Sequence, residues 1–95
     1  MAAFDPLIHP PARLQLMTML TAVSEAEFVT LRDALDVSDS VLSKHVSALA
    51  AEGYVASRKG VVEGRRTTWV SVTPLGLRAL RGHVAALREL IRTVD

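Results

Sequence analysis

Hydrophobic residues recur at helical spacing near the start of the chain. Leu14, Met17 and Leu20 lie three residues apart, which places them on one face of an α-helix. Pro10 and Pro11 precede these residues. Because proline is tolerated in the first helical turn, they favour the start of a helix here. The pattern predicts a first helix from about Pro11 to Val23, followed by a short strand or extended link at Phe28 and Val29.

Two further helices are predicted, each preceded by a residue whose side chain suits an N-cap. Thr30 is placed to cap a short helix over Leu31–Leu35. Ser38 is placed to cap a longer helix that runs to about Glu52, where Gly53 provides a common C-terminal stop.

The pattern then changes from helical spacing to strand-like runs. Tyr54–Lys59 and Thr67–Val72 are predicted to be two strands, the second with valines alternating with other residues. Gly60 and Gly64 bracket a charged turn between them. The two strands therefore form a β-hairpin with a basic tip.

A long final helix is predicted after the hairpin, capped by Thr73 and opened by Pro74. Its apolar residues repeat at alternating intervals of three and four, as in a helix–helix seam. The seam consists of Leu77, Leu80, Val84, Leu87, Ile91 and Val94. A helix of about 20 residues is ~30 Å long, more than so small a domain can cover. We therefore expect the far end of the helix to pack against a partner, most simply a second copy of the chain.

The order of elements indicates a fold that is α+β but mainly α, a winged helix-turn-helix. The 95 residues fit one domain, with a three-helix core and hairpin wing over about 11–73 and a dimerisation helix over 74–95. In this fold the second helix of the helix-turn-helix enters the major groove of DNA.

That recognition helix has an apolar face, formed by Leu42, Val46 and Leu49, and a face of short or basic side chains. Short side chains let the helix backbone approach base edges and phosphates, although a merely solvated polar face has the same pattern. The residues expected to contact DNA are Ser38, Asp39, Ser40, Ser43, Lys44 and Ser47.

Two residues of this helix have alternative interpretations. Asp39 either accepts from a cytosine amino group or faces the positive end of its own helix. His45 lies close to the apolar face and is as well suited to packing as to a phosphate contact.

The net charge is only +1, but its distribution is uneven. The stretch around the second helix is acidic, which should limit nonspecific affinity for DNA. The predicted wing is basic, with Arg58, Lys59, Arg65 and Arg66 against Glu63 alone. This excess favours contact with phosphates or the minor groove over a merely soluble hairpin tip.

Three motifs also resemble those of ArsR-like and MarR-like regulators. Pro11–Leu14 resembles the first-helix pattern of ArsR-like proteins, and Ser38–Val55 resembles their recognition-helix signature. Val72–Gly76 resembles the segment that follows the wing in MarR-like proteins, and the resemblance implies that Arg66 is the wing arginine. The resemblance implies a transcriptional regulator.

The chain departs from the metal sensors among these families. It has no cysteine, and His9, His45 and His83 lie far apart in the sequence. We therefore expect no bound metal and no other cofactor. The absence of cysteine also favours a cytoplasmic location, since small secreted domains often need disulfides.

These observations predict a sequence-specific protein that binds double-stranded DNA, a homodimeric repressor acting at a palindromic operator. An enzyme is not expected, because the sequence has no cysteine nucleophile, acid–base cluster or phosphate-cradling glycine loop. A small-molecule effector is compatible with the sequence but not indicated by it. The alternative is a winged helix that docks a protein partner through its acidic second helix.

Overall fold

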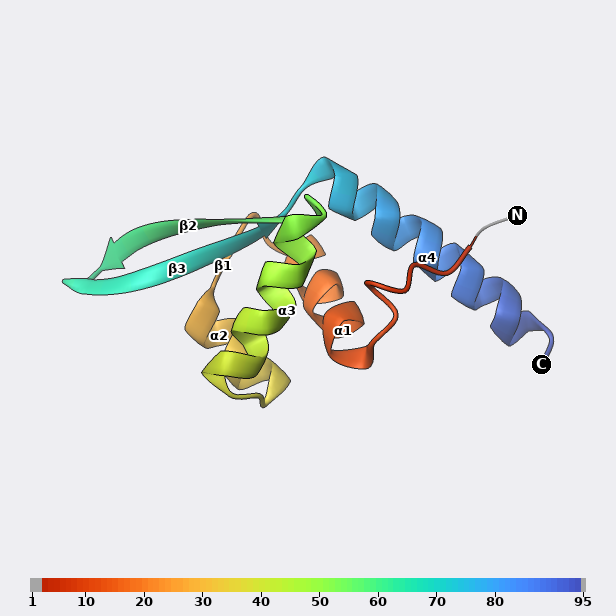
Figure 1. Cartoon of the computed structure of the whole chain (residues 1–95), viewed down its shortest axis with the longest axis horizontal. Helices are drawn as coiled ribbons and strands as arrows, with labels where there is room; N and C mark the ends of the chain where they lie inside the picture. The colour runs from red at the N-terminus through yellow and green to blue at the C-terminus, as the bar shows by residue number, and fades with distance from the viewer. Residues whose placement is uncertain (1–2, 95) are drawn as a thin grey trace.

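A computed structural model of the chain describes residues 3–94. It contains four helices and three strands (Figure 1). In chain order they are α1 (Pro11–Thr21), β1 (Ala26–Glu27), α2 (Phe28–Leu35), α3 (Asp39–Ala51), β2 (Val55–Val62), β3 (Arg65–Val72) and α4 (Pro74–Arg92). The mainly helical winged-helix fold expected from the sequence is confirmed.

The helices α3 and α4 begin with the N-caps that the sequence predicted. Val41 donates its backbone N–H to Ser38 Oγ over 3.2 Å, and Gly76 donates to Thr73 Oγ1 over 3.0 Å. Each hydroxyl satisfies one of the unpaired N–H groups at a helix start. Gly53 follows α3 with a φ of 76°, a conformation that glycine adopts without steric cost.

The structure corrects three boundaries in the first half of the chain. The first helix ends at Thr21, short of Val23. The strand lies at Ala26–Glu27, because these residues pair with Val70 and Trp69 of β3. The second helix begins at Phe28 with Glu27 as its N-cap, so Thr30 lies inside the helix and caps nothing.

The strands of the hairpin are longer than predicted, and its turn is shorter than the predicted turn between Gly60 and Gly64. The turn consists of Glu63 and Gly64, which both have positive φ, as hairpin turns of the type I′ kind require. Gly60 lies within β2 opposite Thr67, where a Cβ atom would lie only 3.0 Å from the Trp69 ring nitrogen. Arg65 and Arg66 are therefore strand residues, not turn residues.

The sheet has the antiparallel order β1–β3–β2 and packs with α1, α2 and α3 around one core. Its fully buried centre combines residues from all three helices and from the segment before α1. Together with Val70 of β3, these residues are Ile8, Leu16, Met17, Leu20, Leu31, Leu42 and Leu49.

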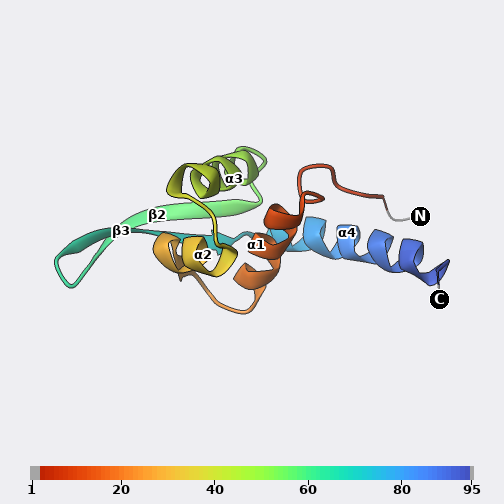
Figure 2. The same cartoon turned by 90° about the horizontal axis from the view of Figure 1, so that it is seen from below.

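The hairpin and α4 extend in opposite directions from this helical body, in a molecule 52 Å long and 21 Å across its shortest axis (Figure 1 and Figure 2). The start of α4 is fixed to the body, since Thr73 Oγ1 donates to the Gly53 carbonyl over 2.6 Å. The far end of α4 exposes Leu90 and Ile91. None of the described helices is long and apolar enough to cross a bilayer.

Candidate nucleic-acid interface

The outward face of α3 is a row of small polar side chains. Ser40, Ser43, Lys44 and Ser47 are all exposed, while Leu42 on the opposite face is fully buried. Ser38, also exposed, lies 3.2 Å from Ser40 through their hydroxyl oxygens and holds the first turn. Three of these four side chains are serines, which hold a ligand less far from the helix backbone than long side chains would.

Asp39 is engaged inside the helix-turn-helix. Its carboxylate accepts from Arg32 of α2 over 2.9 Å, and Arg32 also pairs with Asp33. The hydrogen bonds to Asp39 and Asp33 raise the pKa of Arg32. Neither sequence interpretation of Asp39 included this contact, which ties the recognition helix to the helix before it.

His45 is half-buried and packed, which matches one of its two interpretations. Its Nδ1 accepts from Arg13 Nε of α1 over 3.1 Å. Burial, and then the positive charges of Arg13 and Lys44, lower the pKa of His45. A second nitrogen of Arg13 donates to the Leu7 carbonyl over 3.4 Å.

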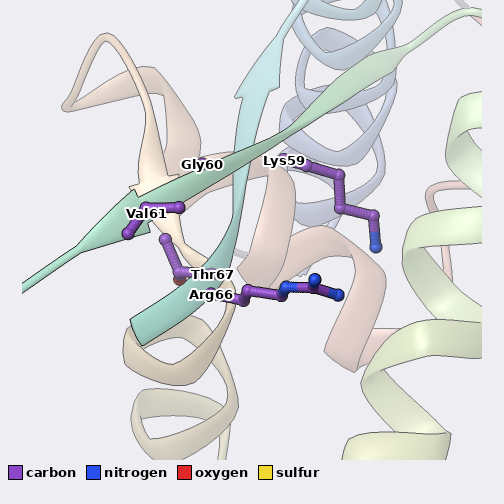
Figure 3. Close-up of a pocket in the computed structure, with 5 residues that line it drawn as sticks. All are labelled: Lys59, Gly60, Val61, Arg66 and Thr67. Carbon is purple, nitrogen blue, oxygen red and sulfur yellow. The ribbon is translucent and has the colours of Figure 1, made fainter. Parts of the chain in front are cut away.

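Alternation along each strand divides the four wing cations between two faces of the hairpin, and the strand register places Lys59 and Arg66 on the same face. Lys59 faces Thr68 and Arg66 faces Val61, and these side chains share the face on which α3 packs. Figure 3 shows the Lys59 and Arg66 side chains extending in the same direction from the two strands. They border a hollow of about 420 Å³ that Val61 and Thr67 also line.

A second hollow joins this wing face to the recognition helix. Its volume is about 330 Å³, and Ser43 and Ser47 of α3 line it together with Ser57, Lys59 and Thr68 of the wing. Serines of α3 and a wing lysine thus line one continuous concave surface, which we call the α3–wing surface. It comprises the outward residues of α3 with Lys59 and Arg66.

Arg58 and Arg65 lie on the opposite face of the wing and are paired with acidic residues. Arg58 Nε donates to Glu25 over 2.9 Å, and the guanidinium lies 5.4 Å from the centre of the Trp69 ring. The hydrogen bond from Arg58 lowers the pKa of Glu25. Arg65 lies 4.0 Å from the Glu27 carboxylate. Trp69 has a packing role here, beneath Arg58.

The sequence of this chain matches a known protein family. A family model described as a winged helix DNA-binding domain matches residues 12–91, from α1 to the end of α4. The chain belongs to this winged-helix family. The family and the fold point to a DNA-binding transcriptional regulator.

Individual relatives support the same assignment for the winged-helix chain. It is 27% identical to a transcriptional regulator homologue from Pyrococcus horikoshii, with a TM-score of 0.86 over 94% of this chain and 88% of that one. It is 25% identical to an uncharacterized protein of Methanocaldococcus jannaschii, over 94% of this chain and 97% of the relative. The zinc-responsive MarR family member ZitR of Lactococcus lactis shares the fold, with 17% identity and a TM-score of 0.63 over 87% and 56% of the two chains.

The apolar seam of α4 changes character along its length. Leu80 is buried, and the half-buried Leu77 and Val84 line a hollow with Thr21 of α1. Leu87, one turn further on, is also half-buried. Ile91 and Val94 are 55% and 82% exposed. The beginning of the seam therefore belongs to the core of one winged-helix chain, and its end has no covering among residues 3–94.

Two features of this winged helix were not found from the sequence. One is the Arg13–His45 contact, and the other is a cluster in which Phe4, Asp5 and His9 surround His83. Both join residues far apart in the chain, and no local pattern signals them. Within the part of the chain that the structure describes, no group of His, Cys, Asp or Glu residues is arranged to hold a metal ion.

Proposed function

We propose that the chain is a sequence-specific, homodimeric repressor of transcription that binds a palindromic site in double-stranded DNA. The observation that carries this proposal is the α3–wing surface. There, unpaired serines of α3 and two wing cations, Lys59 and Arg66, line one concave face. A winged helix binds DNA by placing its recognition helix in the major groove and its wing beside it.

In this arrangement Ser40, Ser43 and Ser47 contact base edges, where a hydroxyl can donate or accept. Lys44 contacts a phosphate, as do Lys59 and Arg66 from the wing, the last at the edge of the minor groove. Ser38 and Asp39 lie at the start of α3 and set its position.

The two remaining wing cations have a supporting role in the proposal. Arg58 and Arg65 hold Glu25 and Glu27, so any contact they make with phosphate competes with an ion pair already formed. We assign them to fixing the angle of the wing. Removing their charge should therefore change DNA affinity less than removing the charge of Lys59 and Arg66.

Dimerisation is proposed through the exposed end of the α4 seam, with a second copy covering Leu87, Ile91 and Val94. A two-fold dimer places two recognition helices about one turn of DNA, ~34 Å, apart. Two linked half-sites bind with a high effective concentration, which raises affinity without new contacts. A repressor of this kind acts in the compartment that holds the chromosome, which we propose is the cytoplasm.

The proposal is tested by selecting DNA sequences from a random pool on the purified chain. Affinity is then measured for the selected sequence and for a scrambled duplex of the same composition. We expect a palindromic consensus that binds at least ~1000-fold more tightly than the scrambled duplex. A chain that ignores DNA even at low salt would instead support the protein-docking alternative, since nonspecific DNA binding is strongest there.

A further inference from the structure

The segment before α1 connects α4 to the rest of the molecule. The backbone N–H of Asp5 donates to Nδ1 of His83 on α4 over 2.9 Å. The carboxylate of Asp5 accepts from the Tyr54 hydroxyl over 2.7 Å, just before β2. Three residues later Ile8 is fully buried in the core. The segment is therefore held at α4, at the sheet and in the core.

The hydrogen bonds of His83 define its protonation. An N–H donor needs a lone pair on the acceptor, so Nδ1 of His83 carries no proton and the ring proton resides on Nε2. That nitrogen lies 3.4 Å from Nδ1 of His9, which accepts from it. Phe4 packs edge-on against both imidazoles, with ring centres 5.5 and 5.6 Å away. Only the neutral form of His83 satisfies this arrangement.

The same segment also reaches the recognition helix. The carbonyl of Leu7 accepts from one guanidinium nitrogen of Arg13, and another nitrogen of Arg13 donates to Nδ1 of His45 on α3. Because Arg13 is always a donor, His45 must also leave Nδ1 unprotonated. These contacts form a chain from α4 to α3, with one neutral histidine at each end. We call this chain the histidine clasp; it consists of His83, Asp5, Leu7, Arg13 and His45.

We propose that the histidine clasp is a proton-sensitive latch that holds α4 against the body and fixes α3 for DNA binding. A proton added at Nδ1 of His83 would face the N–H of Asp5, and one added at Nδ1 of His45 would face Arg13. Each replaces an acceptor by a donor and breaks a contact of the latch. Acidification therefore opens the clasp and weakens operator binding; the DNA part of this inference rests on the proposed function.

The surroundings of both histidines oppose the added charge. Burial, followed by the nearby His9, lowers the pKa of His83, and the Asp5 carboxylate only partly offsets this. Asp5 is already occupied by the Tyr54 hydroxyl and the N–H of Leu7. The charged groups that lower the pKa of His45 are Arg13 of α1 and Lys44 of its own helix.

The direction of the pH effect follows from these shifts. A histidine whose pKa is lower in the clasped state than its unperturbed value of about 6.5 binds protons more readily once the clasp is open. The clasp is therefore complete above about pH 6.5 and is lost as the pH falls below it. A simple surface histidine gives the opposite result, since its positive charge would strengthen DNA binding in acid.

The test is DNA affinity between pH 7.5 and 5.5 at constant ionic strength, for the wild type and His83→Asn. The amide oxygen of asparagine can replace Nδ1 as the acceptor for Asp5 but does not titrate. We expect wild-type affinity to fall, by up to about tenfold per pH unit for each coupled proton. His83→Asn should bind DNA as tightly as the wild type at pH 7.5. Its slope of log affinity against pH should be smaller by the contribution of one coupled proton. Equal slopes, or tighter wild-type binding in acid, would overturn the latch.

A second measurement is independent of DNA. Long-range nitrogen–proton NMR correlations of the free chain report which ring nitrogen of each histidine carries the proton. We expect the Nε2–H tautomer for His83 and His45 at pH 7.5, and titration of both below the usual histidine range. A protonated Nδ1 at that pH would contradict the clasp. If these spectra agree but the chain binds no DNA at any pH, the proposed function fails and the clasp stands.

Discussion

Gly76 in the first turn of α4 lies directly against the backbone of Tyr54, where α3 gives way to β2. A Cβ atom at position 76 would lie 2.0 Å from the Tyr54 carbonyl oxygen. Backbone atoms on one side or the other must then move. Gly76→Ala should therefore destabilise the fold by about 3 kcal/mol, at the upper end of the usual cost of overpacking. Urea unfolding followed by circular dichroism measures this loss.

Gly82 provides a matched control in the same helix. A Cβ atom there meets nothing within 4 Å, and the position is exposed. Gly82→Ala should leave stability unchanged or raise it by up to about 1 kcal/mol, because alanine favours helix more than glycine does. Equal unfolding midpoints for the two variants would show that the α4 start is not fixed by this contact.

The salt dependence of DNA binding tests the division of the wing cations. Lys59→Ala with Arg66→Ala should flatten the slope of log affinity against log salt by about 2 units, one for each lost phosphate contact. The control is Arg58→Ala with Arg65→Ala, which removes the same charge from the opposite face. We expect that control to change the slope by less than about 1 unit. Equal effects would mean that the wing contributes only its total charge.

The serines of α3 should affect discrimination more than general affinity. Ser40→Ala and Ser43→Ala remove hydroxyls from the exposed face without touching the core. Each should reduce the preference for the selected site by about 1 kcal/mol or more, the lower end for a lost base contact. Ser24→Ala, in the exposed turn after α1, is the control. If affinity for selected and scrambled DNA falls equally, these serines position the protein without reading sequence.

Local signals in the sequence were sufficient where the structure is decided locally. The Ser38 and Thr73 caps and the buried face of α3 were predicted because neighbouring residues alone determine them. Phe28 was placed in a short strand or extended link, although Phe28, Leu31 and Leu35 have helical spacing. The strand instead lies two residues earlier, at Ala26–Glu27. Its position depends on a tertiary contact, the pairing of Ala26 with Val70.

The wing cations were identified from the sequence, but their grouping was not. A hairpin shifted by one residue exchanges the two faces of each strand. Alternation along a strand separates Lys59 from Arg58 in any register, but the turn at Glu63 and Gly64 sets the register that places Arg66, and not Arg65, on the face of Lys59. The predicted turn spanned Gly60 to Gly64, too wide a bracket to fix that register. The contacts of His45 and His83 depend on residues more than 30 positions away, which spacing alone does not indicate.

The exposed end of α4 gives the last prediction, a self-association that needs Ile91. Ile91 is 55% exposed in the single chain, so Ile91→Arg leaves the core of the monomer intact. At a two-fold interface the same change buries an unpaired charge, which costs several kcal/mol. We expect a folded monomer that binds half-sites and has lost its preference for the palindrome.

Sedimentation at micromolar concentration measures this directly, with the exposed Thr93→Arg as a control that adds the same charge near the seam. The wild type should sediment as a dimer, and so should Thr93→Arg, because Thr93 is not one of the seam residues. Leu87→Arg, placed where the seam is half-buried, should also dissociate the dimer. A wild type that remains monomeric would remove the second copy from the proposal, and the seam would then serve only to pack α4 against α1.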